Sequence, residues 1–154
     1  MSKKVIAIIL TAAMLILSLS ACGGKKEALS AADFKTKAEA AGLTVTDASS
    51  TYTDAIFTSA QAAKSPDGWY IIYLDVDTVE NAQAYYYTCK TYMEGQKTGA
   101  GSAQTTDHDD YKMYSQSNGG RFMYCAQIAD TFIYVDEDDA NKDAIKSVIK
   151  NLGY

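Results

Sequence analysis

The sequence contains few of the residue types on which enzymatic catalysis most often depends. Among its 154 residues it has one histidine, His108, one arginine, Arg121, and three cysteines. No second histidine is present to complete a two-histidine metal site or a histidine relay. The Gly-x-Ser-x-Gly elbow, the phosphate-binding P-loop and the dinucleotide-binding glycine pattern are also missing. We therefore expect a protein that is not an enzyme and that uses no cofactor or metal.

Basic residues are scarce relative to acidic ones. Without Lys3 and Lys4, which precede an uncharged N-terminal run, 12 basic residues remain against 19 acidic ones, a net charge of −7. Binding of nucleic acid relies on basic residues that neutralise phosphates, so no nucleic-acid partner is predicted. The acidic excess mainly favours solubility.

The first 21 residues differ from the rest of the chain and predict an export signal. Lys3 and Lys4 give a positive start, and the 17 residues from Val5 to Ala21 carry no charge. A basic start, an apolar run and small residues before a cleavage site are typical of secretory signal peptides. An uncleaved transmembrane helix is the alternative, although 17 residues are at the lower limit for spanning a bilayer.

The run ends in the segment Leu19-Ser20-Ala21-Cys22. This segment resembles the lipobox of bacterial lipoproteins, in which a leucine and two small residues precede a cysteine. The resemblance covers the signal peptide and Cys22 alone. It implies that diacylglycerol, with acyl chains such as palmitate, is attached to the Cys22 thiol and that signal peptidase II cleaves before this residue. A fortuitous cysteine behind an ordinary signal peptide is the other interpretation.

The resemblance implies a protein of the cell envelope that is anchored by lipid to the extracytoplasmic side of a membrane. Two acyl chains hold a protein on a bilayer stably. Residues 22–28 would form the lipidated cysteine and a short tether, of which residues 23–27 reach at most about 17 Å. Gly23 stands where an inner-membrane retention aspartate occurs in some two-membrane bacteria. An outer membrane and a single-membrane cell surface are both compatible with it.

Residues 29–154 are predicted to form one α+β domain, in which an antiparallel sheet carries helices on one face. Helices are expected over 29–41, from a cap at 77–80 to residue 93, and from a cap at 138–139 to residue 152. Strands are expected over 43–45, 56–63, 69–76, 111–115, 121–128 and 132–136. Residues 95–110 are expected to form a polar loop.

The order of the predicted elements is an α-β-β-β unit that occurs twice, followed by a C-terminal helix. Ala60–Ala63 leads through a turn to Ile71–Asp75, and the similar Ala126–Ala129 leads to Phe132–Asp136. This similarity predicts an internal repeat that arose by duplication. Coincidence between two ordinary hairpins is the alternative.

Tyrosine is abundant, with 12 residues against four phenylalanines and one tryptophan. If helices cover one face of the sheet, strand alternation sends Tyr73, Phe132 and Tyr134 to the opposite face. Together with Trp69 they form the candidate surface for a protein or small-molecule partner, because large exposed apolar patches are rare in monomers. A half-solvated sheet face is the alternative.

Cys89 and Cys125 are the cysteines that follow Cys22. Neither has a neighbouring basic group or the Cys-x-x-Cys spacing that activates a thiol. Secretion permits a disulfide between them, but both residues also suit the role of small buried apolar groups.

Two acidic segments remain. Asp107–Asp110, which includes His108, is either a solvated loop or the metal or acid/base site of a small hydrolase or metal-dependent enzyme. Asp136–Asp139 precedes a helix, and acidic groups at that position favour capping. The function we expect is a non-enzymatic binding or interaction module of unknown ligand. The enzyme just described and an accessory subunit of a transport or envelope complex are the alternatives.

Overall fold

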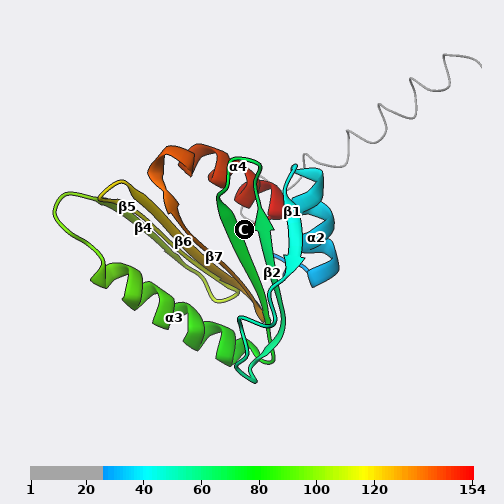
Figure 1. Cartoon of the computed structure of the whole chain (residues 1–154). Helices are drawn as coiled ribbons and strands as arrows, with labels where there is room; N and C mark the ends of the chain where they lie inside the picture. Colours follow the sequence, from blue (N-terminus) through cyan, green and yellow to red (C-terminus); the bar gives the residue numbers. More distant parts are fainter. Residues whose placement is uncertain (1–25) are drawn as a thin grey trace, which may run out of the picture.

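The computed structural model describes residues 26–154, which fold into one antiparallel sheet with three α-helices (Figure 1). The predicted signal peptide, the lipobox-like segment and Cys22 lie outside the described residues. Seven strands follow the order β1-β2-β3-β7-β6-β5-β4, and all neighbours are antiparallel. The predicted fold class, an α+β domain with an antiparallel sheet and a C-terminal helix, is confirmed.

Along the chain, runs of consecutive strands alternate with helices. The strands are β1 (Thr44–Asp47), β2 (Phe57–Lys64), β3 (Tyr70–Val76), β4 (Ser102–Asp107), β5 (Tyr111–Asn118), β6 (Arg121–Ile128) and β7 (Thr131–Asp138). The helices are α2 (Ala31–Ala40), α3 (Val79–Gly95) and α4 (Lys142–Leu152), with the 3-10 turn η1 (Asp139–Asn141) before α4.

The helix ends follow capping signals in the sequence. The Ser30 side chain accepts a hydrogen bond from the backbone N–H of Asp33 at 3.1 Å, and Thr78 accepts one from Asn81 at 3.1 Å. Each bond satisfies an N–H group that has no partner inside its helix. Helix α4 ends at Gly153, whose φ of 99° suits a residue without Cβ.

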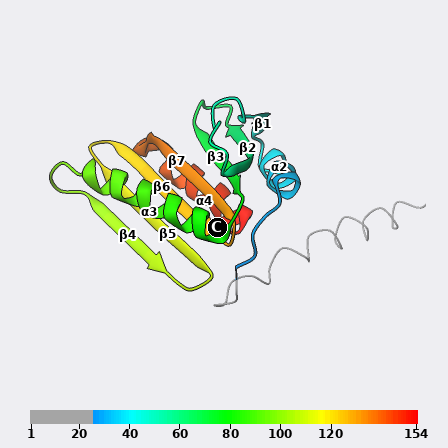
Figure 2. The ribbon, with the colours of Figure 1, turned by 90° about the horizontal axis from the view of Figure 1, so that it is seen from below.

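Helices cover both faces of the sheet, which corrects the prediction that all of them share one face. Helices α2 and α4 pack on one face, called here the α2/α4 face, and α3 packs on the other, called the α3 face (Figures 1 and 2). The physical reason is that the central strands β3 and β7 carry apolar residues at successive positions. Both faces of such strands need cover from water.

The pairing of β3 with β7 decides which side chains share a face. Tyr73 lies opposite Ile133, and Ile72 lies opposite Tyr134. Residues directly opposite each other in a sheet point to the same face. Tyr73 is therefore on the α2/α4 face, whereas Phe132 and Tyr134 are on the α3 face. The predicted grouping of these three rings on one face is wrong.

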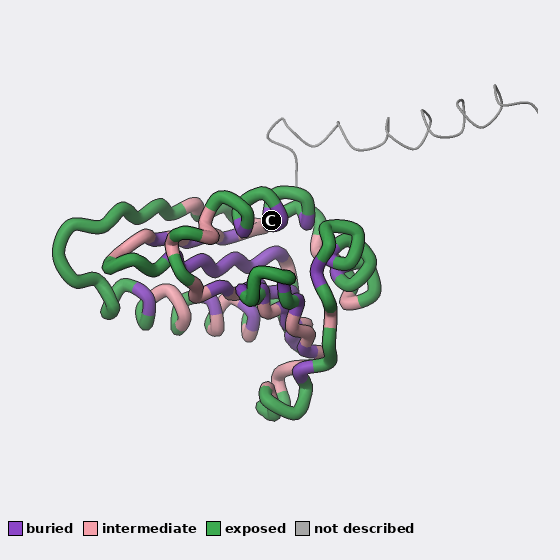
Figure 3. Tube along the Cα trace, turned by 45° about the horizontal axis from the view of Figure 1, so that its top comes forward, coloured by how far each residue is buried: buried purple, intermediate pink, exposed green. Residues whose placement is uncertain are grey.

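The predicted polar loop over residues 95–110 contains an additional strand, β4, which forms one edge of the sheet (Figure 2) and is exposed along most of its length (Figure 3). Its residues Ser102–Asp107 pair with β5 and are mostly exposed on both sides. The strand was not predicted because its sequence is polar at nearly every position. A strand without an apolar side gives no alternation to detect.

The internal repeat stays a prediction. The first unit has three strands after its helix, whereas α3 is followed by four. Tyr73 and Tyr134, which match in the two sequence segments, point to opposite faces of the sheet. The hairpins β2-β3 and β6-β7 meet through the antiparallel pair β3-β7, so a two-fold axis perpendicular to the sheet would relate them. Such a rotation leaves each side chain on its own face of the sheet. In a simple duplication, two matched residues would therefore point to the same face.

Candidate functional site

An apolar cleft opens on the α3 face between helix α3 and the sheet. Its volume is about 360 Å³, within the range of roughly 300–1,000 Å³ that is common for small-molecule sites. The lining comes from α3, strands β3 and β7, and the connection between β1 and β2. We call it the aromatic cleft, and its residues are Tyr52, Ile72, Leu74, Tyr85, Thr88, Cys89, Tyr92 and Tyr134.

Helix α3 contributes four of these residues. They are separated by three, one and three positions, a spacing that brings them onto one side of the helix: Tyr85, Thr88, Cys89 and Tyr92. Tyr86, on a neighbouring stripe, is fully buried against the sheet. One side of the helix thus fixes its position, and the adjoining side forms a wall of the cleft.

Aromatic rings behind the lining of the cleft pack edge to face against Tyr85. The Tyr85 ring centroid lies 5.2 Å from that of Phe57 and 4.9 Å from that of Phe132, with interplanar angles of 83° in both pairs. Tyr52 extends the row, 5.9 Å from Phe57 at 89°. Such pairs contribute about 0.5–1.5 kcal/mol each beyond the burial of area. The row therefore fixes the ring surface that a ligand would meet.

The polar groups of the cleft are hydroxyls and one thiol. Burial raises the pKa of Cys89 to about 11, so the thiol is protonated at neutral pH and is a poor nucleophile. Burial also raises the pKa of the Tyr85 and Tyr134 hydroxyls, and Tyr134 donates a hydrogen bond to Asp136 at 3.3 Å. The cleft thus offers neutral hydrogen-bonding groups within an apolar surface, which suits binding.

Of the four residues predicted to form a binding surface, Tyr134 alone lines the cleft. Tyr73 and Phe132 are fully buried, and Trp69 is 4% exposed. These three rings therefore form no accessible surface, because the helices that cover both faces bury them. The prediction is corrected for these three residues, and Tyr134 remains a candidate ligand contact.

Sequence reasoning missed Tyr52, Tyr85 and Tyr92. The run of three tyrosines at positions 85–87 held a signal, since consecutive helical residues point in directions about 100° apart and cannot all be buried. Tyr86 is fully buried and Tyr87 is 46% exposed, whereas Tyr85 lines the cleft. Tyr52 lies in a connection and had no comparable signal.

Cys89 and Cys125 are free thiols in this structure and belong to the same apolar core on the α3 face. Cys125 is fully buried on β6, and burial raises the pKa of its thiol far above the ordinary value. Cys125 therefore fits the interpretation as a buried apolar group, whereas Cys89 is half-buried at the cleft, and no disulfide joins the two residues in this structure.

The acidic segment Asp107–Asp110 lies at the β4–β5 turn. Asp107 forms an ion pair with Lys112, and this hydrogen bond holds the pKa of Asp107 below its ordinary value. The His108 ring packs against Tyr111 with centroids 4.6 Å apart. Within residues 26–154, no group of three or more His, Cys, Asp or Glu side chains is placed to hold a metal ion.

The second acidic segment, Asp136–Asp139, joins β7 to the C-terminal helix. The Asp138 side chain accepts a hydrogen bond from the backbone N–H of Ala140 at 2.8 Å and so caps the 3-10 turn η1. Helix α4 itself follows Asn141, which forms no side-chain cap, so the predicted cap precedes the helix by one short turn. Asp136 pairs with the guanidinium of Arg121 on the neighbouring strand. Arg121 is thus held at the end of the sheet and does not reach into the aromatic cleft.

Comparison with known proteins found no family model, no curated protein and no solved structure that matches this chain. None of the helices within residues 26–154 combines the length and the apolar character needed to cross a bilayer.

Proposed function

We propose that this chain is a lipid-anchored envelope protein whose domain binds a small, neutral, ring-bearing molecule in the aromatic cleft without catalysing a reaction. The observation that carries the proposal is the cleft itself, with about 360 Å³ of space and four tyrosines in its lining. Small-molecule sites typically combine an apolar lining with a few polar groups that orient the ligand.

The chemistry of the lining defines the ligand class. Among the described residues, no charged side chain lines the cleft, so an ionic ligand would find no counter-charge there. Tyrosine rings offer flat faces and edges for stacking, and the hydroxyls of Thr88 and Tyr134 offer hydrogen bonds. A neutral molecule with one or two rings and a hydroxyl or N–H group fits these features.

The lipid anchor in the proposal rests on the resemblance of Leu19–Cys22 to a lipobox. Its test is the Cys22→Ser variant, expressed in a bacterial host that is fed a labelled fatty acid. The native chain should carry the label and fractionate with membranes, and the variant should lose both properties. Equal membrane association of the two chains, with no label in either, would reject the anchor and leave the cleft untouched.

The cleft is tested with indole as a neutral ring-bearing probe and cyclohexanol as a saturated probe of similar size. Binding is measured by NMR titration of the domain. Tyr92→Ala should weaken indole binding about five- to tenfold, the worth of one aromatic contact. The matched control is Tyr87→Ala on the same helix, since Tyr87 is 46% exposed and lies outside the lining.

Two results would contradict binding in the cleft. The first is cyclohexanol binding as tightly as indole, which would remove the role of the aromatic rings. The second is an equal loss of indole binding in Tyr92→Ala and Tyr87→Ala, which would locate the contact elsewhere on α3. Both variants change side chains that are about half exposed, so the fold should be retained.

A further inference from the structure

A second groove lies on the opposite face of the sheet, between helix α4 and the hairpin of β4 and β5. It consists of two hollows of about 110 and 200 Å³. Both hollows are lined by Gln104, Ser115 and Lys146, so they adjoin along the helix. We call this feature the lysine groove, and it goes beyond the proposed function because it shares no residue with the aromatic cleft.

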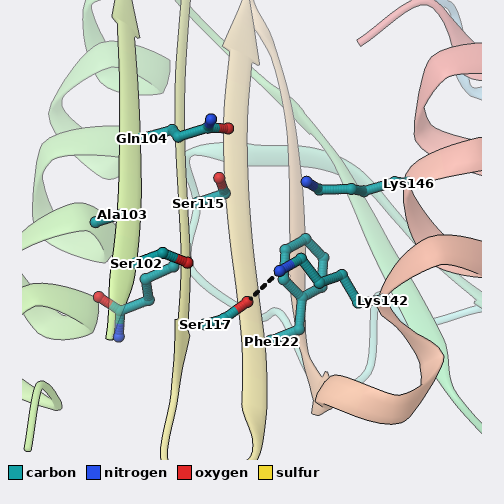
Figure 4. Close-up of a pocket in the computed structure, with 9 residues that line it drawn as sticks. Ser102, Ala103, Gln104, Ser115, Ser117, Phe122, Lys142 and Lys146 are labelled. Atoms are coloured by element: carbon teal, nitrogen blue, oxygen red, sulfur yellow. Dashed lines mark hydrogen bonds between the residues drawn. The ribbon is translucent and has the colours of Figure 1, made fainter. Parts of the chain in front are cut away.

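One wall of the groove is a row of lysines on α4. Lys142, Lys146 and Lys150 follow at four-residue steps and all line the hollows. A step of four helical residues rises about 6 Å, so the row covers about 12 Å. Figure 4 shows Lys142 and Lys146 extending from α4 toward the strands. The other side of this helix, with Ile145 and Leu152, is buried against the sheet and fixes the row in place.

The floor of the first hollow is made mainly of hydroxyl and amide side chains, whereas the second hollow also has an apolar and aromatic lining that includes Met113 and Tyr124. Ser102 pairs with Ser117 across β4 and β5, and Gln104 pairs with Ser115. The Lys142 ammonium group already donates a hydrogen bond to the Ser117 hydroxyl at 2.8 Å (Figure 4). These groups can donate and accept hydrogen bonds, so the floor suits a ligand that is rich in oxygen.

The groove is positively charged although the chain is acidic. Within residues 26–154, no Asp or Glu lines either hollow. Lys142 has Asp139 at 3.9 Å, whereas Lys146 and Lys150 form no ion pair with any residue that the structure describes. Tyr124, which lines the second hollow, is 6% exposed, and its hydroxyl has no hydrogen-bond partner among these residues. Charge and an unpaired hydroxyl thus meet at one site.

We propose that the lysine groove binds an extended, soluble chain of polyol units joined by phosphodiesters. Lysine ammonium groups bind phosphate oxygens as point charges, and a row with steps of about 6 Å can engage successive phosphates. The serine and glutamine side chains of the floor then bind the polyol oxygens between them. A flat bilayer surface would meet the rim of the groove and leave its two hollows unfilled, which favours a linear chain as the occupant.

The test uses the full chain in neutral detergent and poly(glycerol phosphate) as the probe, with calorimetry at several salt concentrations. Lys146→Gln/Lys150→Gln should weaken binding about tenfold at low salt. It should also lower the slope of log affinity against log salt by about 1.4, since each phosphate contact contributes about 0.7. The matched control is Lys35→Gln/Lys37→Gln, which removes the same charge from two exposed positions of α2 and should change affinity less than twofold.

Three results would overturn the proposal. Equal weakening by both double variants would show that net charge alone attracts the probe. Equal binding of polyglutamate would show that the groove does not distinguish phosphate from carboxylate. Tighter binding to phosphatidylglycerol vesicles than to the soluble chain, lost in Lys146→Gln/Lys150→Gln, would assign the lysine row to a membrane surface. None of these outcomes bears on indole binding in the aromatic cleft, so the two proposals can fail separately.

Discussion

The two faces of the sheet differ in how closely their helices cover the central strands. On the α2/α4 face the Phe34 ring stacks on Tyr73 with centroids 4.5 Å apart, and both side chains are fully buried. On the α3 face the same strands β3 and β7 border the aromatic cleft. One pair of strands thus supplies a closed core on one side and an open site on the other. Stability and binding should therefore be separable by face.

The substitution Phe34→Ala on the α2/α4 face is expected to have the largest effect on stability, and it tests whether the two faces are independent. The side chain is fully buried on the α2/α4 face, and its removal should lower the free energy of unfolding by about 3–5 kcal/mol. Urea denaturation measures this loss. In the protein that remains folded, indole should bind as in the native chain, because Phe34 and the cleft are on opposite faces. A parallel loss of indole affinity would show that the faces are coupled.

A smaller effect separates the two cysteines of the α3 face, measured in the Cys22→Ser variant so that no third thiol reacts. Cys89 is half-buried in the cleft with a pKa of about 11, so its labelling rate should rise about tenfold per pH unit between pH 7 and 10. Cys125 is fully buried and should react only on unfolding. Indole should slow the labelling of Cys89. Equal labelling rates of both thiols would mean that the α3 face is open along its whole length.

The smallest effect is expected from Asp75→Asn, next to the closed core. Burial raises the pKa of Asp75 above its ordinary value of 3.8, although the hydrogen bond from Tyr73 opposes the shift. The folded state therefore holds this proton more tightly than the unfolded state does, and stability is lost as pH rises from about 4 through the raised pKa. Asp75→Asn should flatten the stability profile in that window. Parallel profiles for the two proteins, measured by denaturation at several pH values, would contradict this.

The parts of the fold that were predicted correctly depend on neighbours in the sequence. The cap predicted at 77–80 is Thr78 at the start of α3, and the predicted turn between the segments Ala60–Ala63 and Ile71–Asp75 joins β2 to β3. These signals act over a few residues, so a single sequence contains the information. The existence of strands β3 and β7 followed for the same reason from their apolar and aromatic residues.

The distribution of side chains between the two faces could not be predicted in the same way. Alternation establishes that Tyr73 and Leu74 point to opposite faces, but it does not say which helix covers each face. That depends on the register of β3 with β7, where Ile72 meets Tyr134, 62 positions later in the chain. The candidate site inherited this error, because Tyr85 and Tyr92 become part of a site only when α3 crosses the face that carries Tyr134.

The ladder between β3 and β7 also has a consequence for how the chain is made. Strand β3 has β2 as one neighbour, and its other neighbour, β7, begins at Thr131, 55 positions after β3 ends at Val76. The centre of the sheet therefore cannot close until β7 has been synthesised. Pairings between distant segments are also slow to form. Until β7 pairs with β3, β3 remains an edge strand with apolar side chains, so the sheet acquires both of its covered faces only with this long-range pairing.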